Sequence, residues 1–274
     1  MKHTIPVLSF LLLAAFTVRG QYGSNPSAGG YVNVGDARIY YEVYGSGKPV
    51  VLLHGGLFGY INEYAQLIPR LTLTHKVILI ATRGHGKSEV GTRDFSYALF
   101  AEDTYQVIRK LTADSVTVIG FSDGANQAYW LATTHPEVVQ RLVAIAGNWG
   151  ANDFTGNHKQ FHDSLSGEFM MKNFSDFVKV RQTLMPEPDR FVEFVNKLAV
   201  VWRQPVYVTP EMISRISCPT MIIAGQNDGC PIERYVEMYR LLQHGELAII
   251  PGSDHLVLTR KPELVADIIL DYLK

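Results

Sequence analysis

A serine between two glycines is the first feature of this chain with clear chemical potential. Gly120-Phe121-Ser122-Asp123-Gly124 fits the pattern Gly-x-Ser-x-Gly. The run before it, 115–119, is apolar and β-branched, and small and apolar residues fill 125–132 after it, so we expect a strand, a sharp turn and a helix. Such a turn exposes a hydroxyl at the end of a buried strand, and the glycines allow helix and strand to approach closely. The pentapeptide alone is common, but this context makes Ser122 the candidate nucleophile.

A serine nucleophile needs a base, and the base needs an acid that orients it. Two late apolar runs each continue into a loop, the first ending at Asp228 and the second at His255. Because loops after parallel strands meet at one edge of a sheet, we expect both side chains near Ser122. Asp228 could instead cap the helix that follows it, and His255 could bond only to backbone. Asp254 is a weaker candidate for the acid, since adjacent side chains diverge.

The sequence His54-Gly55-Gly56-Leu57 follows another apolar run and offers backbone donors for an oxyanion. We expect the amides of Gly56 and Asp123 to form the oxyanion hole, with Leu57 as the alternative to Gly56; a plain tight turn is the other explanation of the loop. The side chains of His54 and Asp123 are candidates for contacting the substrate. The Asp123 carboxylate could attract an ammonium group, or it could only complement the helix dipole.

Short apolar runs alternate with helix-compatible segments along most of the chain, which favours a mostly parallel, doubly wound α/β sheet. An opening antiparallel hairpin is expected over 31–34 and 37–44. Further strands are expected over 49–53, 77–81, 115–120, 142–146, 220–224 and 247–250. Helices are expected over 61–71, 97–111, 125–135, 232–242 and 262–272.

One interval interrupts this alternation. Residues 148–216 contain amphipathic segments but no clear strand, and 191–198 has apolar residues on one helical face. The sequence therefore predicts a helical cap over 148–216, inserted into an α/β core formed by 31–147 and 217–274.

The first twenty residues have the composition of a secretory signal peptide. Lys2 precedes an apolar run over 5–18, which is shorter than the ~20 residues that a membrane-spanning helix needs. We expect cleavage near Gly20, a flexible N-terminus over 21–30, a secreted or periplasmic protein, and no stable membrane anchor after cleavage.

Charge and motif spacing argue against other partners. Without Lys2 and Arg19, 23 basic residues face 26 acidic ones, so nucleic-acid binding has no electrostatic support. Gly86-Lys87-Ser88 ends like a phosphate-binding loop, but the required earlier glycine is replaced by Ala81, which argues against nucleotide binding.

Metal ligands and disulfides also lack support in the sequence. His158 and His162 are four residues apart with no evident third ligand, so no metal site is predicted. Cys218 and Cys230 fall on opposite ends of one expected strand, too far apart to bridge, and are predicted to be free thiols. No cofactor is expected.

Taken together, the chain resembles the α/β-hydrolase superfamily over nearly all of residues 21–274. The resemblance depends on motifs that occur in the family's order: His54-Gly55-Gly56, Arg83-Gly84-His85-Gly86-Lys87-Ser88, the segment around Ser122, Asp228 and His255. Phe121-Ser122-Asp123-Gly124 is also similar to the valacyclovir hydrolase, or biphenyl hydrolase-like, branch, in which the acid matching Asp123 is associated with recognising an amino group. The family often has an acid where this chain has Ala81. This departure from the family pattern affects the scaffold rather than the triad.

The function that this resemblance and these residues imply is an exported serine hydrolase. It would cleave carboxylic esters of small to medium size through a Ser-His-Asp triad and an acyl-enzyme. The same triad could act on an amide or aminoacyl substrate, on a C–C bond, or in perhydrolysis. A more remote alternative is a ligand-binding homologue without catalysis. Neither the particular substrate nor the oligomeric state follows from the sequence.

Overall fold

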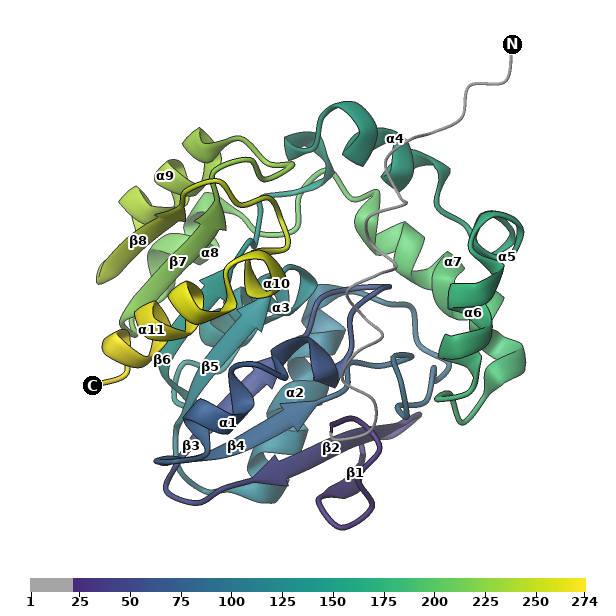
Figure 1. The fold of residues 1–274 in the computed structure, drawn as a ribbon, viewed down its shortest axis with the longest axis horizontal. Coiled ribbons are helices and arrows are strands. Elements are labelled where there is room, and N and C mark those ends of the chain that lie inside the picture. Colours follow the sequence, from purple (N-terminus) through teal and green to yellow (C-terminus); the bar gives the residue numbers. More distant parts are fainter. Residues whose placement is uncertain (1–21) are drawn as a thin grey trace.

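A computed structural model describes residues 22–274 (Figure 1). The expected signal peptide, residues 1–20, lies outside the described residues. No helix within 22–274 is long and apolar enough to cross a membrane.

The described chain forms one eight-stranded sheet in the order β1-β2-β4-β3-β5-β6-β7-β8. The antiparallel pairings are β1 with β2 and β2 with β4, and every pairing from β4 across to β8 is parallel. The strands are β1 (Gly29–Asn33), β2 (Arg38–Tyr44), β3 (Lys48–Leu53), β4 (His75–Ile80), β5 (Val116–Phe121), β6 (Val139–Ile145), β7 (Thr220–Gly225) and β8 (Gly245–Ile250). The predicted α/β fold with an opening antiparallel hairpin is confirmed.

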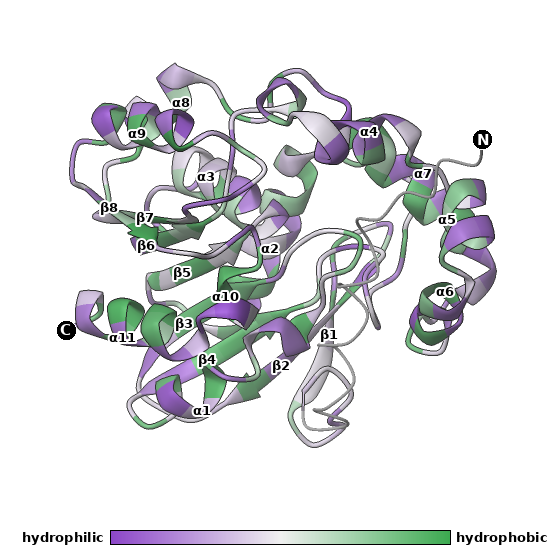
Figure 2. Cartoon of the chain, turned by 45° about the horizontal axis from the view of Figure 1, so that its top comes forward, coloured by the Kyte–Doolittle hydropathy of each residue, from purple (hydrophilic) through white to green (hydrophobic). Residues whose placement is uncertain are grey.

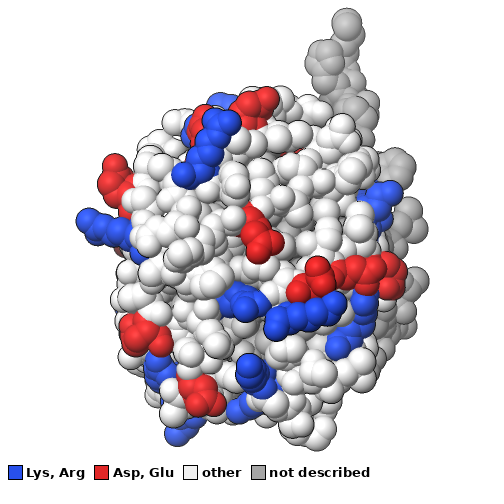
Figure 3. Space-filling view, turned by 90° about the vertical axis from the view of Figure 1, so that its left-hand side faces the viewer, with Lys and Arg blue, Asp and Glu red and all other residues white. Residues whose placement is uncertain are grey.

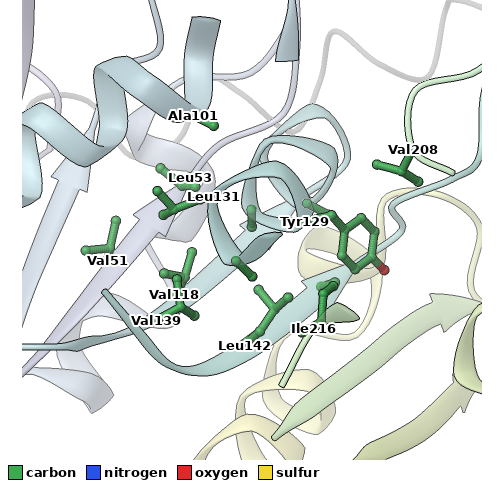
Figure 4. Packing of buried hydrophobic residues seen from close by; sticks show 14 of the residues in the cluster. Val51, Leu53, Ala101, Val118, Tyr129, Leu131, Val139, Leu142, Val208 and Ile216 are labelled. Carbon is green, nitrogen blue, oxygen red and sulfur yellow. The ribbon is translucent and has the colours of Figure 1, made fainter. Parts of the chain in front are cut away.

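Alternating strand residues supply two apolar layers, one on each face of the sheet. On β3, Val51 and Leu53 join the first layer, while Val50 and Leu52 join the second. Figure 4 shows part of the first layer, which includes Val51, Leu53, Val118 and Leu142 of the sheet and Tyr129 of a covering helix. Its helices are α2 (Tyr97–Leu111), α3 (Asp123–Thr134), α8 (Pro210–Arg215) and α9 (Ile232–Leu241). The second layer is covered by η1 (Ile61–Tyr64), α1 (Ile68–Leu71), α10 (Val257–Arg260) and α11 (Pro262–Tyr272).

The helix predicted over 61–71 is broken into η1 and α1. Pro69 has no backbone N–H to donate to residue 65, so a continuous helix would lose a bond there. By contrast, α2 and α11 have the predicted bounds. The Ser96 hydroxyl accepts the Leu99 amide at 3.1 Å and caps the start of α2.

Between β6 and β7 the chain is helical, and its first helices form a separate group at the upper right of Figure 1. They are η2 (Ala151–Asp153), α4 (Gly156–Ser164), α5 (Gly167–Asn173), α6 (Ser175–Gln182), η3 (Pro188–Arg190) and α7 (Phe191–Trp202). We call α4 to α7 the cap. α8 also lies in the predicted insertion, but Ile213 and Ile216 pack in the sheet's own core. The packing boundary therefore falls before α8. Figure 2 shows apolar strands and more hydrophilic cap helices α4 to α6.

The described part of the predicted flexible segment, 22–30, is held against the sheet. The amides of Gly23 and Asn25 each donate to the buried Glu42 carboxylate at 2.8 Å, and β1 already begins at Gly29. The buried Glu42 carboxylate needs hydrogen-bond donors, and the amides of this segment supply them. The prediction that 22–30 is flexible is therefore corrected.

Charges of both signs are interspersed on the face in Figure 3, the left-hand side of Figure 1. This mixing agrees with the near-neutral composition.

Candidate active site

Ser122 occupies the sharp turn between β5 and α3. Its φ of 54° and ψ of −115° are unusual for a residue with a side chain, and such strain costs on the order of 1–3 kcal/mol. The Ser122 amide donates to the carbonyl of Ile145 at 2.8 Å, which fixes the turn against β6. A Cβ at position 124 would collide with the carbonyl oxygen of Leu53, so only glycine allows α3 to start this close to β3. The strand–turn–helix arrangement is as predicted.

The structure brings Ser122, His255 and Asp228 together in hydrogen-bond order. His255 Nε2 lies 2.9 Å from Ser122 Oγ, and His255 Nδ1 lies 3.0 and 3.2 Å from the two oxygens of Asp228. With the ring proton on Nδ1, His255 donates to Asp228 and its Nε2 accepts the Ser122 hydroxyl. The Asp228 side chain is fully buried, whereas that of His255 is 25% exposed. This arrangement can transfer a proton from the hydroxyl to the imidazole.

Burial and the ion pair act in opposite directions on these two groups. Burial alone lowers the pKa of His255, but the charge and hydrogen bond of Asp228 outweigh it, so that the pKa of His255 is raised above its ordinary value. Burial raises the pKa of Asp228, but the charge and hydrogen bond of His255 leave that pKa below its ordinary value. Asp228 is therefore ionised at neutral pH and stabilises a protonated His255.

Asp254, the competing acid, is used elsewhere. Its carboxylate accepts the Leu256 amide at 3.0 Å and pairs with Arg260 at 3.1 Å, where both side chains are more than 40% exposed. It makes no hydrogen bond to the adjacent His255 ring. The geometry thus favours Asp228 as the partner of His255.

Three backbone amides near Ser122 are available to a ligand. Within residues 22–274, the N–H groups of Gly56, Leu57 and Asp123 have no hydrogen-bond acceptor. The neighbouring amide of Gly55 instead donates to Glu63 Oε2 at 2.7 Å. The loop therefore offers Gly56 or Leu57, together with Asp123, as oxyanion donors, and their role stays a prediction.

Glu63 was not identified from the sequence, where it is an ordinary acid in an expected helix. Burial raises its pKa to about 7, against the opposing effect of the Gly55 amide, and its charge is one of those that raise the pKa of His255. The carboxylate thus both holds the glycine loop and influences the base. No local sequence signal marks this role, because the contact between Gly55 and Glu63 depends on how the chain between them folds back.

The Asp123 side chain connects the turn at Ser122 to two other parts of the molecule. Its oxygens accept the Tyr97 hydroxyl of α2 and the Trp202 indole N–H of α7, both at 2.8 Å. Burial raises the pKa of Asp123, while these two bonds oppose the rise. No Lys or Arg in the described chain pairs with this carboxylate. Its predicted contact with a substrate ammonium group stays a prediction.

The structure contradicts the substrate-contacting role proposed for the side chain of His54. This ring is 1% exposed, its Nδ1 donates to the Gly55 carbonyl at 2.6 Å, and its Nε2 accepts the Thr82 amide at 2.9 Å. Burial lowers the pKa of His54 to about 4, so the ring is neutral. With both nitrogens occupied by backbone, His54 holds the β3 and β4 loops together.

The other histidines and cysteines form no candidate metal site among the described residues. His162 stacks on Trp202, with ring centroids 4.7 Å apart, and no group of three or more potential metal ligands occurs in 22–274. Cys218 and Cys230 are free thiols, as predicted.

Comparisons with known proteins agree on the fold. The family model described as "alpha/beta hydrolase fold" matches residues 49–161. The chain is similar to 2-hydroxy-6-oxo-6-(2'-aminophenyl)hexa-2,4-dienoic acid hydrolase of Metapseudomonas resinovorans, with 23% identity over 89% of this chain and 90% of the relative. It is also similar to the serine hydrolase BPHL of Homo sapiens, with 23% identity over 82% of this chain and 79% of the relative.

Solved structures show the same architecture. A serine hydrolase involved in carbazole degradation superposes with a TM-score of 0.73 at 22% identity, covering 89% of this chain and 98% of that one. The esterase EaEST from Exiguobacterium antarcticum superposes with a TM-score of 0.70 at 24% identity, covering 86% and 95%. The sheet order, the family model matched over 49–161 and these relatives agree: the chain has the α/β-hydrolase fold and is a serine hydrolase.

Proposed function

We propose that this enzyme hydrolyses carboxylic esters of small to medium size through Ser122, His255 and Asp228. The observation that carries the proposal is the continuous hydrogen-bond chain from the Ser122 hydroxyl through His255 to the buried Asp228. Relatives described as a putative esterase/lipase of Haemophilus influenzae and as esterase YbfF of Escherichia coli support an ester substrate.

Acylation begins when Ser122 Oγ attacks the ester carbonyl carbon. The hydroxyl proton moves to His255 Nε2, the Oγ–C bond forms, and the carbonyl π electrons move to oxygen. The amides of Asp123 and of Gly56 or Leu57 stabilise the oxyanion. Asp228 stabilises the imidazolium, which then protonates the leaving alkoxide as the ester C–O bond breaks.

Deacylation repeats these steps with water in place of serine. His255 removes a proton from water, the hydroxide adds to the acyl carbon, and the same amides stabilise the second oxyanion. Collapse releases the carboxylic acid, and the proton on His255 returns to Ser122 Oγ. These steps use only groups of the chain, the ester substrate and one water molecule.

Ser122→Ala tests the nucleophile. The variant should lose covalent labelling by a fluorophosphonate and lower the turnover of a p-nitrophenyl ester by several orders of magnitude, with an unchanged melting temperature. Turnover near that of the wild type would refute the proposed triad.

A substrate panel tests the bond that is cleaved. Acyl esters of increasing length, aminoacyl arylamides and a 2-hydroxy-6-oxo-dienoic acid would be compared by kcat/KM. The dienoic acid is included because two relatives are named for the hydrolysis of 2-hydroxy-6-oxo acids of this kind, one a dienoic acid and the other a dienedioate or trienedioate. If kcat/KM for the dienoic acid exceeds that for every ester, the proposed reaction becomes C–C hydrolysis by the same triad.

We also propose that the protein is exported, on the basis of residues 1–20 alone. N-terminal sequencing of the protein made in a host with an export pathway should find a start near Gln21 outside the cytoplasm. An intact Met1 would contradict export.

A further inference from the structure

We propose that two cap residues, Trp202 and Arg181, are positioning residues for the oxyanion hole, so that the cap takes part in transition-state stabilisation besides enclosing the substrate. This inference rests on the proposed function, because it assigns a role toward the oxyanion of that reaction. It arises from contacts that the cap makes with both sides of the hole.

Trp202, at the end of α7, contacts both residues that supply the predicted donors. Its indole N–H donates to Asp123 Oδ2 at 2.8 Å. A Cβ at position 56 would collide with the same Asp123 oxygen and lie 2.7 Å from Cζ2 of Trp202. The indole edge and the Asp123 carboxylate are therefore packed directly on the backbone of Gly56. Trp202 is only 8% exposed and is stacked against His162 of α4, so its position is fixed from the cap side.

Arg181, in α6, holds the same glycine loop from its other end. Its Nη2 donates to the carbonyl of Phe58, two residues beyond Gly56. The guanidinium also lies 5.1 Å from the ring centroid of Phe177. The ring of Phe58 packs against Phe161 and Phe177 of the cap, with centroid distances of 5.8 and 5.0 Å. The loop is thus anchored in the cap by the backbone carbonyl of Phe58 and by the ring of Phe58.

Oxyanion stabilisation depends on donors that are already oriented when the charge develops. The Asp123 amide is fixed by the turn at Ser122. The glycine loop is held by Glu63, by the bond of His54 to the Gly55 carbonyl and by the bond of the Gly59 amide to the Gly56 carbonyl, and the cap adds the contacts of Trp202 and Arg181. Because Trp202 spans Gly56 and Asp123, it sets the separation of the two donors. A displacement of about 1 Å at such a site can cost on the order of 100-fold in rate.

The test uses Trp202→Phe, which keeps an aromatic ring in place and removes the indole N–H. Trp130→Phe is the matched control: its indole N–H also joins α3 to the chain after the cap, at 2.8 Å from the Tyr207 carbonyl, but it contacts neither Gly56 nor Asp123. Arg181→Met is the second test variant. The concentration of active sites in each enzyme is measured by complete fluorophosphonate titration. Rates are then expressed per active site, so that unfolded protein does not affect them.

Ester hydrolysis and binding of a trifluoromethyl ketone are then measured. This ketone forms a hemiketal oxyanion with the nucleophile and reports on the hole directly. Trp202→Phe and Arg181→Met should each lower kcat by about 10- to 100-fold and weaken ketone binding by a similar factor, with KM changed by less than about threefold. Trp130→Phe should stay within about twofold of the wild type in both readouts.

Equal losses in Trp202→Phe and Trp130→Phe, or a loss in KM alone, would overturn the positioning role. If Trp202→Phe cannot be obtained folded, Arg181→Met decides by the same criteria. Failure of the underlying function is distinguishable, since it would appear as an active Ser122→Ala enzyme, whatever the cap variants do.

Discussion

Replacing Asp228 by Asn should retain the shape of the site and remove the charge that supports His255. In the wild type, both Asp228 oxygens lie within 3.2 Å of His255 Nδ1, and the side chain has no exposed surface. An amide can accept from Nδ1–H through one oxygen only, or donate to Nδ1 and force the proton onto Nε2, where it blocks acceptance from Ser122. It also gives no stabilisation to a protonated ring. By analogy with a serine protease triad, the loss in kcat is about 10⁴-fold, or about 5 kcal/mol of transition-state stabilisation.

The assay is the kcat/KM of a p-nitrophenyl ester at neutral pH, with Asp254→Asn as the matched control. Asp254 has the same chemistry one residue from His255, but it forms an exposed pair with Arg260 that contributes roughly 0–1 kcal/mol. Asp254→Asn should therefore change kcat/KM by less than about threefold. A loss below tenfold in Asp228→Asn, or a larger loss in Asp254→Asn, would refute the assignment of the acid.

Three other predictions concern pH dependence and stability. For the wild type, kcat/KM should fall as the pH drops through the pKa of His255, above the ordinary value of 6.5, because the protonated ring cannot accept the serine proton. Glu63→Gln should move this acidic limb to lower pH, since the charge of Glu63 raises the pKa of His255; an unmoved limb in a pH–rate profile would contradict this. Arg83→Leu should lower the free energy of unfolding by about 3–5 kcal/mol in chemical denaturation, because it leaves the buried Asp103 carboxylate without its two bonds of 2.8 and 2.9 Å. A loss below about 1 kcal/mol would show that Asp103 is neutral in the fold.

The fold class and the triad candidates follow from local patterns in the sequence. Apolar runs separated by helix-length segments require a parallel sheet, and such a sheet places the ends of its strands at one edge. Ser122, Asp228 and His255 each follow such a run, so that their meeting needs only the topology. The sharp turn at Ser122 was equally predictable, because Gly120 and Gly124 lie on either side of it.

Predictions were less accurate where tertiary contacts decide the outcome. The helix expected over 61–71 has the right residues but is interrupted near Pro69, and 22–30 is fixed by the distant Glu42. His54 illustrates the same limit. A histidine beside a glycine loop looks like a substrate contact, but its burial and its bond to the Thr82 amide follow from the packing of β3 beside β4.

The sequence by itself determined the candidates for nucleophile, base and acid, because covalent order and strand alternation control where those three side chains lie. Only the tertiary structure decided what surrounds them. Glu63 reaches Gly55, and Trp202 reaches Asp123 across 79 residues of chain. Such contacts have no signature in the sequence, since they depend on how the cap is seated on the sheet, and that depends on the shapes of many side chains at once.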